Sequence, residues 1–256
     1  MKVILRKAKA LLEELKILFH SVPGVLLALF VISIVGMNLL ANKSIDTGLD
    51  WFALDCGIIL SWLSFLTMDI LTKRFGPRAS ILISIVALAI NWLVCLIFFL
   101  ASLIPGFWGE SFVETGGEAI NRALNRTFAG DWFVVFGSSV AFIASAVANA
   151  LLNWTIGKAF KKHPDGFFAF SMRAYGSTVA AQFLDNLLFA LIVSLNLFGW
   201  NLAQCFTCAA TGAVAELLME VVFSPFGYWV LRHYEKDKVG QAYIDYRAMK
   251  LTEAQA

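Results

Sequence analysis

Long apolar runs, separated by short polar segments, follow one another along almost the whole chain. Each run approaches the roughly 20 residues that a helix needs to cross about 30 Å of hydrocarbon. The pattern predicts six transmembrane helices, at residues 23–41, 52–71, 81–104, 132–157, 176–198 and 204–231. We therefore expect an all-α integral membrane protein built as a six-helix bundle.

Composition supports this class and leaves little room for a soluble domain. Hydrophobic residues make up 59% of the 256 positions and charged residues 15%, with a mean hydropathy of +0.75. A soluble domain is much more polar. The first apolar run follows a charged stretch and precedes no small-residue cleavage site, so it predicts a retained helix and not a signal peptide. We expect a cytoplasmic amphipathic helix at 1–20, a transport domain at 21–233 and a cytoplasmic tail at 234–256.

The N-terminal segment alternates apolar and basic residues at helical spacing. This pattern is typical of a helix that lies on a membrane surface, so we expect it on the inner leaflet, held by anionic lipid. Its apolar positions are Val3, Ile4, Ala8, Leu11, Leu12, Leu15, Leu18 and Phe19.

Lysine and arginine placement predicts the orientation, because loops rich in these residues stay in the cytoplasm. If both ends lie inside, all but three of the 20 basic residues fall on the cytoplasmic side. The three exceptions are Lys43, Arg122 and Arg126. The sequence thus predicts a multi-pass protein of the inner membrane with both termini cytoplasmic.

The outer loop at 105–131 is the longest external segment. It is rich in glycine and carries a short helical pattern at Ile120, Leu124 and Phe128. Two interpretations stay open, a lid or half-inserted hairpin over a site, and a plain surface loop.

The sequence lacks the motifs that are typical of soluble enzymes and of metal sites. Cys205 and Cys208 form a C-x-x-C, but His20, His163 and His233 fall on the opposite side of the membrane in this topology, and a zinc site needs four converging ligands. The two cysteines are more typical of small side chains on one helix face. There is no phosphate-binding loop and no catalytic elbow. We expect a protein that is not an enzyme, with no metal, no cofactor and no nucleic-acid partner.

Acidic residues at membrane depth carry the functional signal, because buried ionisable groups are costly and usually face a cavity or another helix. Five of the 18 acids lie in predicted spans, namely Asp55, Asp69, Asp185, Glu216 and Glu220. On the sixth span Glu216 and Glu220 are four residues apart. Two such carboxylates would not both stay ionised, so we expect a bound proton or a nearby cation.

The fifth span carries a polar face, because Thr178, Gln182, Asp185 and Phe189 are spaced four, three and four residues apart. Together with Asn186, this face predicts a polar lining that suits a small planar solute, neutral or cationic, with hydrogen-bond donors. Amides on other spans join helices or extend the lining. Asp69, four residues before Lys73, is typical of a local ion pair at the interface. The candidate substrate-binding residues are Asp185, Gln182, Phe189, Thr178, Asn149, Asn153, Glu216, Glu220, Asn91 and Asp69.

Four segments together resemble the VUT family, the vitamin-uptake-type proteins that include the queuosine precursor transporter. They are TMDILTKRFG at 67–76, FVVFGSSVAFIASAVANALLNWTIGK at 133–158, YGSTVAAQFLDNLLF at 175–189 and AELLMEVVFSPFGYWVL at 215–231. The resemblance covers roughly residues 25–235 and implies a six-helix fold similar to the binding subunits of energy-coupling-factor transporters. It also implies uptake of 7-deazaguanine bases such as preQ0 and preQ1.

Residue by residue, the resemblance places Asp69 on the family's acid before the first inner loop, Gln182 and Asp185 on its fifth-helix polar pair, and Pro225 on its sixth-helix proline. A deazaguanine presents an amidine-like edge that a carboxylate binds with two hydrogen bonds, while an aromatic ring such as that of Phe189 stacks on the base.

Three positions depart from the family pattern. This chain has Ala150 and Asn153 in place of a Gln and an Asp, and Glu216 in place of a Lys. A carboxylate has become an amide and a cation has become an anion, which favours a more cationic ligand.

Three hypotheses stay open. The chain is an importer that acts alone, as a facilitator or by proton coupling through Glu216 or Glu220. Alternatively, it is a vitamin-binding subunit that needs ATPase and scaffold partners and takes a different vitamin-like substrate. As a third option, the acids only hold helices together. The purine-like substrate and the lipid bilayer are the expected partners, and a homo-oligomer stays open.

Overall fold

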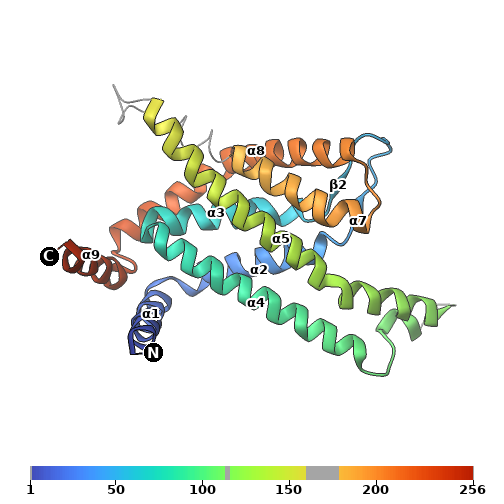
Figure 1. Cartoon of the computed structure of the whole chain (residues 1–256), viewed down its shortest axis with the longest axis horizontal. Helices are drawn as coiled ribbons and strands as arrows, with labels where there is room; N and C mark the ends of the chain where they lie inside the picture. The colour runs from blue at the N-terminus through green and yellow to red at the C-terminus, as the bar shows by residue number, and fades with distance from the viewer. Residues whose placement is uncertain (1, 113–115, 160–178, 256) are drawn as a thin grey trace. The chain divides into compact units, whose positions relative to one another are not determined.

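Helices make up most of the chain in the computed structural model, which describes residues 2–112, 116–159 and 179–255 (Figure 1). Residues 179–189 are also helical and lead into the π-helix η2. The remaining elements are α1 (Lys2–Ser21), α2 (Gly24–Leu40), β1 (Ser44–Ile45), β2 (Leu54–Asp55), α3 (Ile58–Phe75), α4 (Pro77–Leu103), η1 (Gly109–Phe112), α5 (Gly117–Ala159), η2 (Ala190–Ser194), α7 (Leu195–Leu197), α8 (Leu202–Lys236) and α9 (Gln241–Gln255).

Four stretches of the described residues are long and apolar enough to cross a membrane, namely Pro77–Leu103, Gly117–Ser145, Val179–Leu197 and Leu202–Phe223. A fifth arises if α1 and α2 are counted as one broken span, although the two helices meet at 107°. The remaining predicted span corresponds to α3, which carries Asp69, Lys73 and Arg74 within 18 residues. The predicted multi-pass helical protein is confirmed with four or five such stretches, and the six-helix count stays a prediction.

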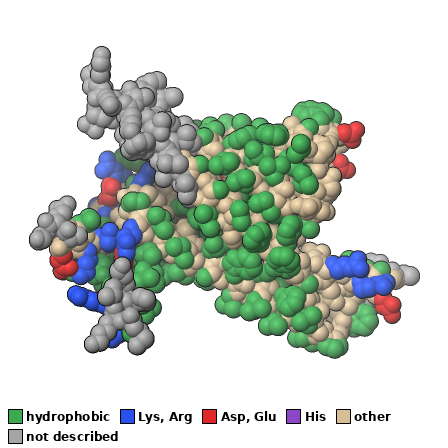
Figure 2. Space-filling view, in the orientation of Figure 1, with side chains coloured by type: hydrophobic (Ala, Val, Ile, Leu, Met, Phe, Trp, Pro, Cys, Tyr) green, Lys and Arg blue, Asp and Glu red, His purple; other side chains and the backbone are tan. Residues whose placement is uncertain are grey.

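Helix α4 shows the burial pattern expected in lipid. Buried residues recur every four positions along the helix, and most of them have small or polar side chains. Large apolar side chains are exposed on the other side. The buried residues include Ala79, Ile83, Ala87, Asn91 and Cys95, and the exposed ones include Ile81, Ile85, Leu93, Ile97 and Leu100. Figure 2 shows hydrophobic side chains along α4 and α5 on the face in view. Small residues allow helix backbones to approach closely inside a membrane.

The chain divides into two compact units. We call Met1–Ile34, Leu63–Ala89 and Glu220–Ala256 the terminal unit, and Val35–Trp62 with Ile90–Met219 the central unit. The terminal unit holds both ends of the chain, and the central unit holds the predicted fifth span.

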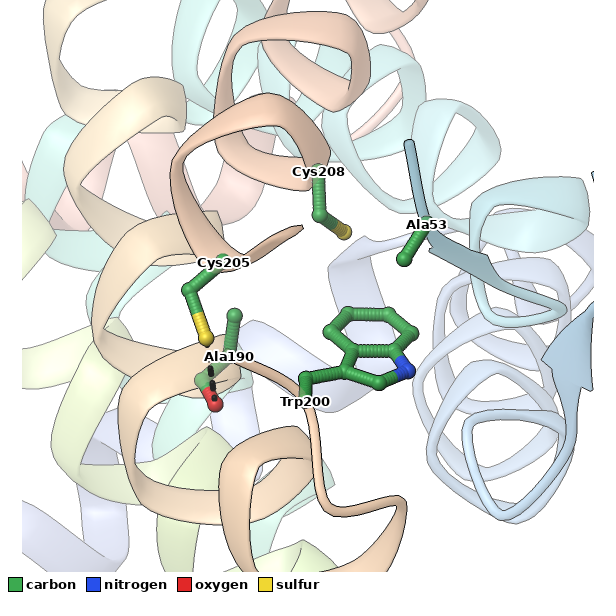
Figure 3. Close-up of a cluster of buried hydrophobic side chains, with 5 residues drawn as sticks. All are labelled: Ala53, Ala190, Trp200, Cys205 and Cys208. Atoms are coloured by element: carbon green, nitrogen blue, oxygen red, sulfur yellow. Dashed lines mark hydrogen bonds between the residues drawn. The ribbon is translucent and has the colours of Figure 1, made fainter. Parts of the chain in front are cut away.

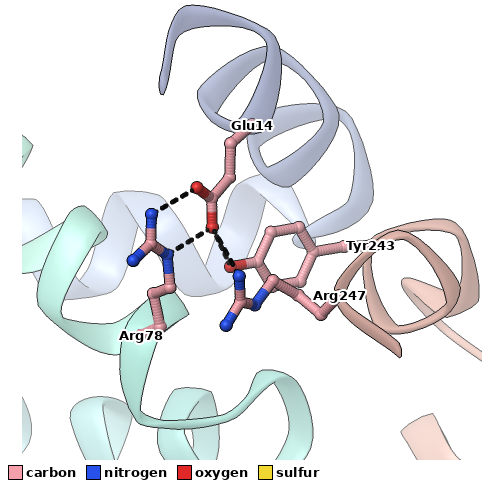
Figure 4. Close-up of polar contacts among 4 residues, drawn as sticks. All are labelled: Glu14, Arg78, Tyr243 and Arg247. Atoms are coloured by element: carbon pink, nitrogen blue, oxygen red, sulfur yellow. Dashed lines mark hydrogen bonds and ion pairs between the residues drawn. The ribbon is translucent and has the colours of Figure 1, made fainter. Parts of the chain in front are cut away.

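A buried carboxylate joins three helices of the terminal unit (Figure 4). Glu14 of α1 accepts two hydrogen bonds from the Arg78 guanidinium of α4, at 2.7 and 2.8 Å, and a third from the Tyr243 hydroxyl of α9, at 3.2 Å. Arg247 of α9 lies 3.7 Å from the same carboxylate. The hydrogen bond from Arg78 lowers the pKa of Glu14, against the effect of burial. Helix α1 is thus tied to α9, a helix that the sequence patterns did not predict in the tail.

Gly240 makes the turn into α9 possible. Its φ of +71° is a left-handed conformation that side chains disfavour, and an added Cβ would overlap the Phe75 ring and the Ser21 carbonyl oxygen. The Arg74 guanidinium also donates to the Val239 carbonyl at 3.0 Å.

In the central unit, the predicted outer loop at 105–131 is largely ordered helix. The helical pattern predicted at Ile120, Leu124 and Phe128 is confirmed, but it belongs to α5, which begins at Gly117 and continues without a break into the following span. The indole of Trp108 donates to Asn125 at 2.8 Å and packs against the Phe128 ring, with centroids 4.7 Å apart. These contacts fold the shorter remaining loop onto the start of α5.

Candidate functional site

The fifth predicted span packs between α5 and α8 in the central unit. A Cβ at Gly137 of α5 would overlap Val193, so the two helices touch closely there. A second contact joins Ser145, two turns after Gly137 on α5, to Asp185, two turns before Val193 on the fifth span. Moving forward along one helix is moving backward along the other, so the two helices are antiparallel. Glycine at position 137 brings the backbones together and so places Asp185 against α5.

Asp185 accepts a hydrogen bond from the Ser145 hydroxyl at 2.9 Å. The same hydroxyl lies 3.0 Å from the Phe142 carbonyl oxygen, a second acceptor on its own helix. Since a serine has one hydroxyl hydrogen, it donates fully to only one of the two at a time. With respect to the described residues, Asp185 therefore keeps most of its capacity to accept hydrogen bonds from a ligand.

Gln182 lies one turn before Asp185 on the same face. Its side chain is 1% exposed, and neither its amide nitrogen nor its amide oxygen has a hydrogen-bond partner among the described residues. A buried amide without partners is costly, and such a group in a native structure calls for water or a ligand. It presents an NH2 group with two N–H donors and a carbonyl oxygen that accepts.

Glu216 supplies a second buried carboxylate, from α8, and is 3% exposed. The Asn186 amide donates to it over a long 3.5 Å, and Ser61 of α3 also hydrogen-bonds to it. Gly212 makes room for this contact, because a Cβ there would lie 2.7 Å from the Asn186 amide nitrogen. Two neighbouring residues of the fifth span thus contact different helices, Asp185 through Ser145 of α5 and Asn186 through Glu216 of α8.

The described surroundings of both carboxylates are neutral or acidic. Their hydrogen-bond partners are hydroxyls and an amide, and Glu216 interacts electrostatically with Asp185 and Asp55. Within the described part of the chain, no lysine, arginine or histidine forms an ion pair with either of them. Burying uncompensated charges costs several kcal/mol each, so the arrangement favours a proton or a cationic ligand.

The other predicted site residues have different surroundings. Asn91 of α4 is 2% exposed, and its amide nitrogen has no partner among the described residues. Asp69 forms the predicted ion pair with Lys73 on its own helix.

Phe189 packs against a hydrophobic cluster of Ala41, Val134 and Val193, so a stacking role stays a prediction. Thr178 and the side chains of Asn149, Asn153 and Glu220 lie outside the described residues.

Cys205 and Cys208 are free thiols in a hydrophobic cluster with Ala53, Ala190 and Trp200 (Figure 3). The Cys205 thiol points to the Ala190 carbonyl oxygen at 3.6 Å, where the helix widens into η2. Both cysteines are buried, and they join the start of α8 to the end of the fifth span. This placement is the structural one predicted from their spacing.

The sequence patterns missed two partners of the site, Ser61 and Ser145. Ser61 is one of two serines in α3, and Ser145 lies in a serine- and alanine-rich part of α5. Nothing in the sequence separates such a hydroxyl from one bonded to its own helix. Asn186 was predicted in the lining, but its contact with Glu216 was not.

Buried carboxylates beside amide groups without a described partner can bind a polar solute inside a helical membrane protein. The sequence model of the family described as "Putative vitamin uptake transporter" matches residues 55–230. The chain belongs to this family, as the resemblance of its motifs predicted. No match appears among curated proteins or among solved structures.

Proposed function

We propose that the protein imports a small heteroaromatic base, a queuosine precursor of the 7-deazaguanine type, and binds it at Gln182 and Asp185. The observation that carries the proposal is the fully buried Gln182 amide, which has no partner among the described residues and lies one turn from a buried carboxylate. A deazaguanine offers the complementary groups. Its ring N–H and its exocyclic amine donate two hydrogen bonds to a carboxylate, and its ring carbonyl oxygen accepts one from the amide nitrogen of Gln182.

The proposed topology has six spans in the inner membrane and both termini in the cytoplasm. The contact of α1 with α9 through Glu14 and Tyr243 supports an even number of crossings, since it holds both ends of the chain on one side. Five apolar stretches are identified if α1 and α2 are counted as one broken span, and we propose that α3 is the sixth.

A carrier that acts without an ATPase is the version that the packing of α4 supports. A subunit that docks on a scaffold needs small residues exposed on a lipid-facing side. In the first half of α4, four of the five small residues, Ala79, Ser80, Ser84 and Ala87, are buried instead, and Ala89 is exposed. We propose transport and no catalysis, with a proton on Glu216 as one route of coupling.

The test is the queuosine content of tRNA in cells that can neither make nor import the precursor, with preQ0 or preQ1 supplied in the medium. Expression of the wild-type chain should restore queuosine. Asp185→Asn should abolish restoration at an unchanged membrane level, because an amide cannot accept both hydrogen bonds. Equal restoration by the variant would show that the acids only join helices. No restoration by the wild-type chain would point to another substrate or to a missing partner.

A further inference from the structure

We propose that the site selects a base that carries a cationic amine over a neutral base with the same ring, and that Glu216 is the residue that binds the amine. This inference rests on the proposed function and deepens it. preQ1 carries an aminomethyl group that is protonated at neutral pH, whereas preQ0 carries an uncharged nitrile at the same position.

The helical geometry sets the two carboxylates on either side of Gln182. Gln182 is three residues before Asp185 and four before Asn186, and both spacings bring side chains to one face of a helix. Asp185 contacts Ser145 of α5, while Asn186 contacts Glu216 of α8. A planar ligand against the open amide of Gln182 therefore has one carboxylate toward each neighbouring helix.

The two carboxylates suit different parts of such a ligand. Asp185 is adjacent to the amide along the helix face and takes the amidine-like edge of the ring. Glu216 lies across on α8, where its described partners are Asn186 and Ser61. A carboxylate has about four acceptor positions. The two described donors leave some of these positions available for hydrogen bonds from an ammonium group.

The groups that face Glu216 supply no competing cation in the described part of the chain. They are Ser61 of α3, Asp55 of β2, Asp185 and Asn186 of the fifth span, and Cys208 two turns away on α8. All are neutral or acidic. A cationic ligand removes the cost of burying Glu216 as an anion, whereas a neutral ligand leaves this cost in place.

The experiment compares initial uptake rates of preQ1 and preQ0 in the same precursor-deficient cells. For the wild-type chain we expect preQ1 to be preferred by about tenfold or more, the effect of one close charge pair. Glu216→Gln should lower the ratio of preQ1 uptake to preQ0 uptake to near one, whatever its effect on the absolute rates. Glu118→Gln, which removes an exposed acid at the start of α5, should leave the preference unchanged.

A second measurement on the wild-type chain separates charge from size and does not depend on how the variant folds. An N-methylated preQ1, still cationic, should compete for uptake, and an N-acetylated preQ1, which is neutral, should compete poorly. Equal wild-type rates for preQ0 and preQ1 would overturn the charge selection and leave the proposed function standing. A preference that persists in Glu216→Gln would overturn the role of Glu216. If neither base enters, the proposed function itself fails.

Discussion

At the scale of single residues, the hydroxyl of Ser145 is the described contact that holds Asp185 in place. Replacing Ser145 with alanine removes a hydrogen bond to a carboxylate, a contribution of about 1.5–3 kcal/mol. We expect the half-saturation concentration for uptake to rise about tenfold, with little change in the amount of folded protein. Uptake rates measured over a range of substrate concentrations check this.

Thr127→Ala is the matched control for this change. Its hydroxyl also belongs to α5 but donates to the Ala123 carbonyl of the same helix, at 3.1 Å. Uptake by Thr127→Ala should match that of the wild-type chain. If Ser145→Ala also matches it, Asp185 does not depend on α5 for its position.

Gly212→Ala tests the contact between Asn186 and Glu216. The added methyl group would lie 2.7 Å from the Asn186 amide nitrogen and push the end of that side chain away from Glu216. Because the end of an asparagine can move, we expect normal folding and a fall in uptake of about three- to tenfold. Gly130→Ala adds the same methyl group where no atom lies within 4 Å and should have no effect. Equal uptake by the two variants would exclude a role for this contact.

The polar face of the fifth span was predictable because helical spacing alone brings Gln182, Asp185 and Asn186 together. Their partners were not predictable. Which serine meets Asp185 depends on the rotation and approach of α5, and these follow from the close contact at Gly137. Periodicity in one segment carries no information about the register of its neighbour.

At the scale of elements, apolar runs located the spans but not all of the helix ends. Helix α3, which corresponds to the predicted span at 52–71, begins only at Ile58. The residues before it are taken up by the pairing of β1 with β2 and by the hydrogen bond from the Gly57 backbone N–H to the Asp55 carboxylate, at 2.8 Å. Helix α9 was missed because its sequence is polar. Hydropathy detects burial in lipid and not helix formation, so helices outside the membrane escape it.

We call the contacts of Glu14 with Arg78, Tyr243 and Arg247 the clasp between α1 and α9. This clasp should weaken when Glu14 loses its charge. Glu14→Gln leaves the half-exposed Arg78 free to hydrate, so the cost is about 1–2 kcal/mol at pH 7. Hydrogen exchange of residues 241–255 should then quicken about tenfold. Glu253→Gln removes an exposed ion pair with Lys250 on α9 and should leave the exchange unchanged. Equal exchange in both variants would contradict a stabilising role for Glu14.

The pH dependence of the clasp has a definite sign. The pKa of Glu14 is lowered in the folded state by Arg78, so its stabilisation is complete above the ordinary carboxyl value of 4.5 and is lost as the pH falls below it. Protection of α9, corrected for the intrinsic exchange rate, should fall between about pH 5 and pH 3 in the wild-type chain. It should fall much less in Glu14→Gln.

At the scale of the whole molecule, the clasp and the distribution of basic residues lead to the same topology by independent arguments. The clasp brings the two terminal helices together, and in the proposed topology the basic residues place both ends in the cytoplasm. Fluorescent-protein fusions at either end should therefore be fluorescent, and alkaline phosphatase fusions there inactive. Phosphatase inserted at Gly48, in the turn between β1 and β2, should be active. Ends on opposite sides would require an odd number of spans and would rule out the contact between α1 and α9.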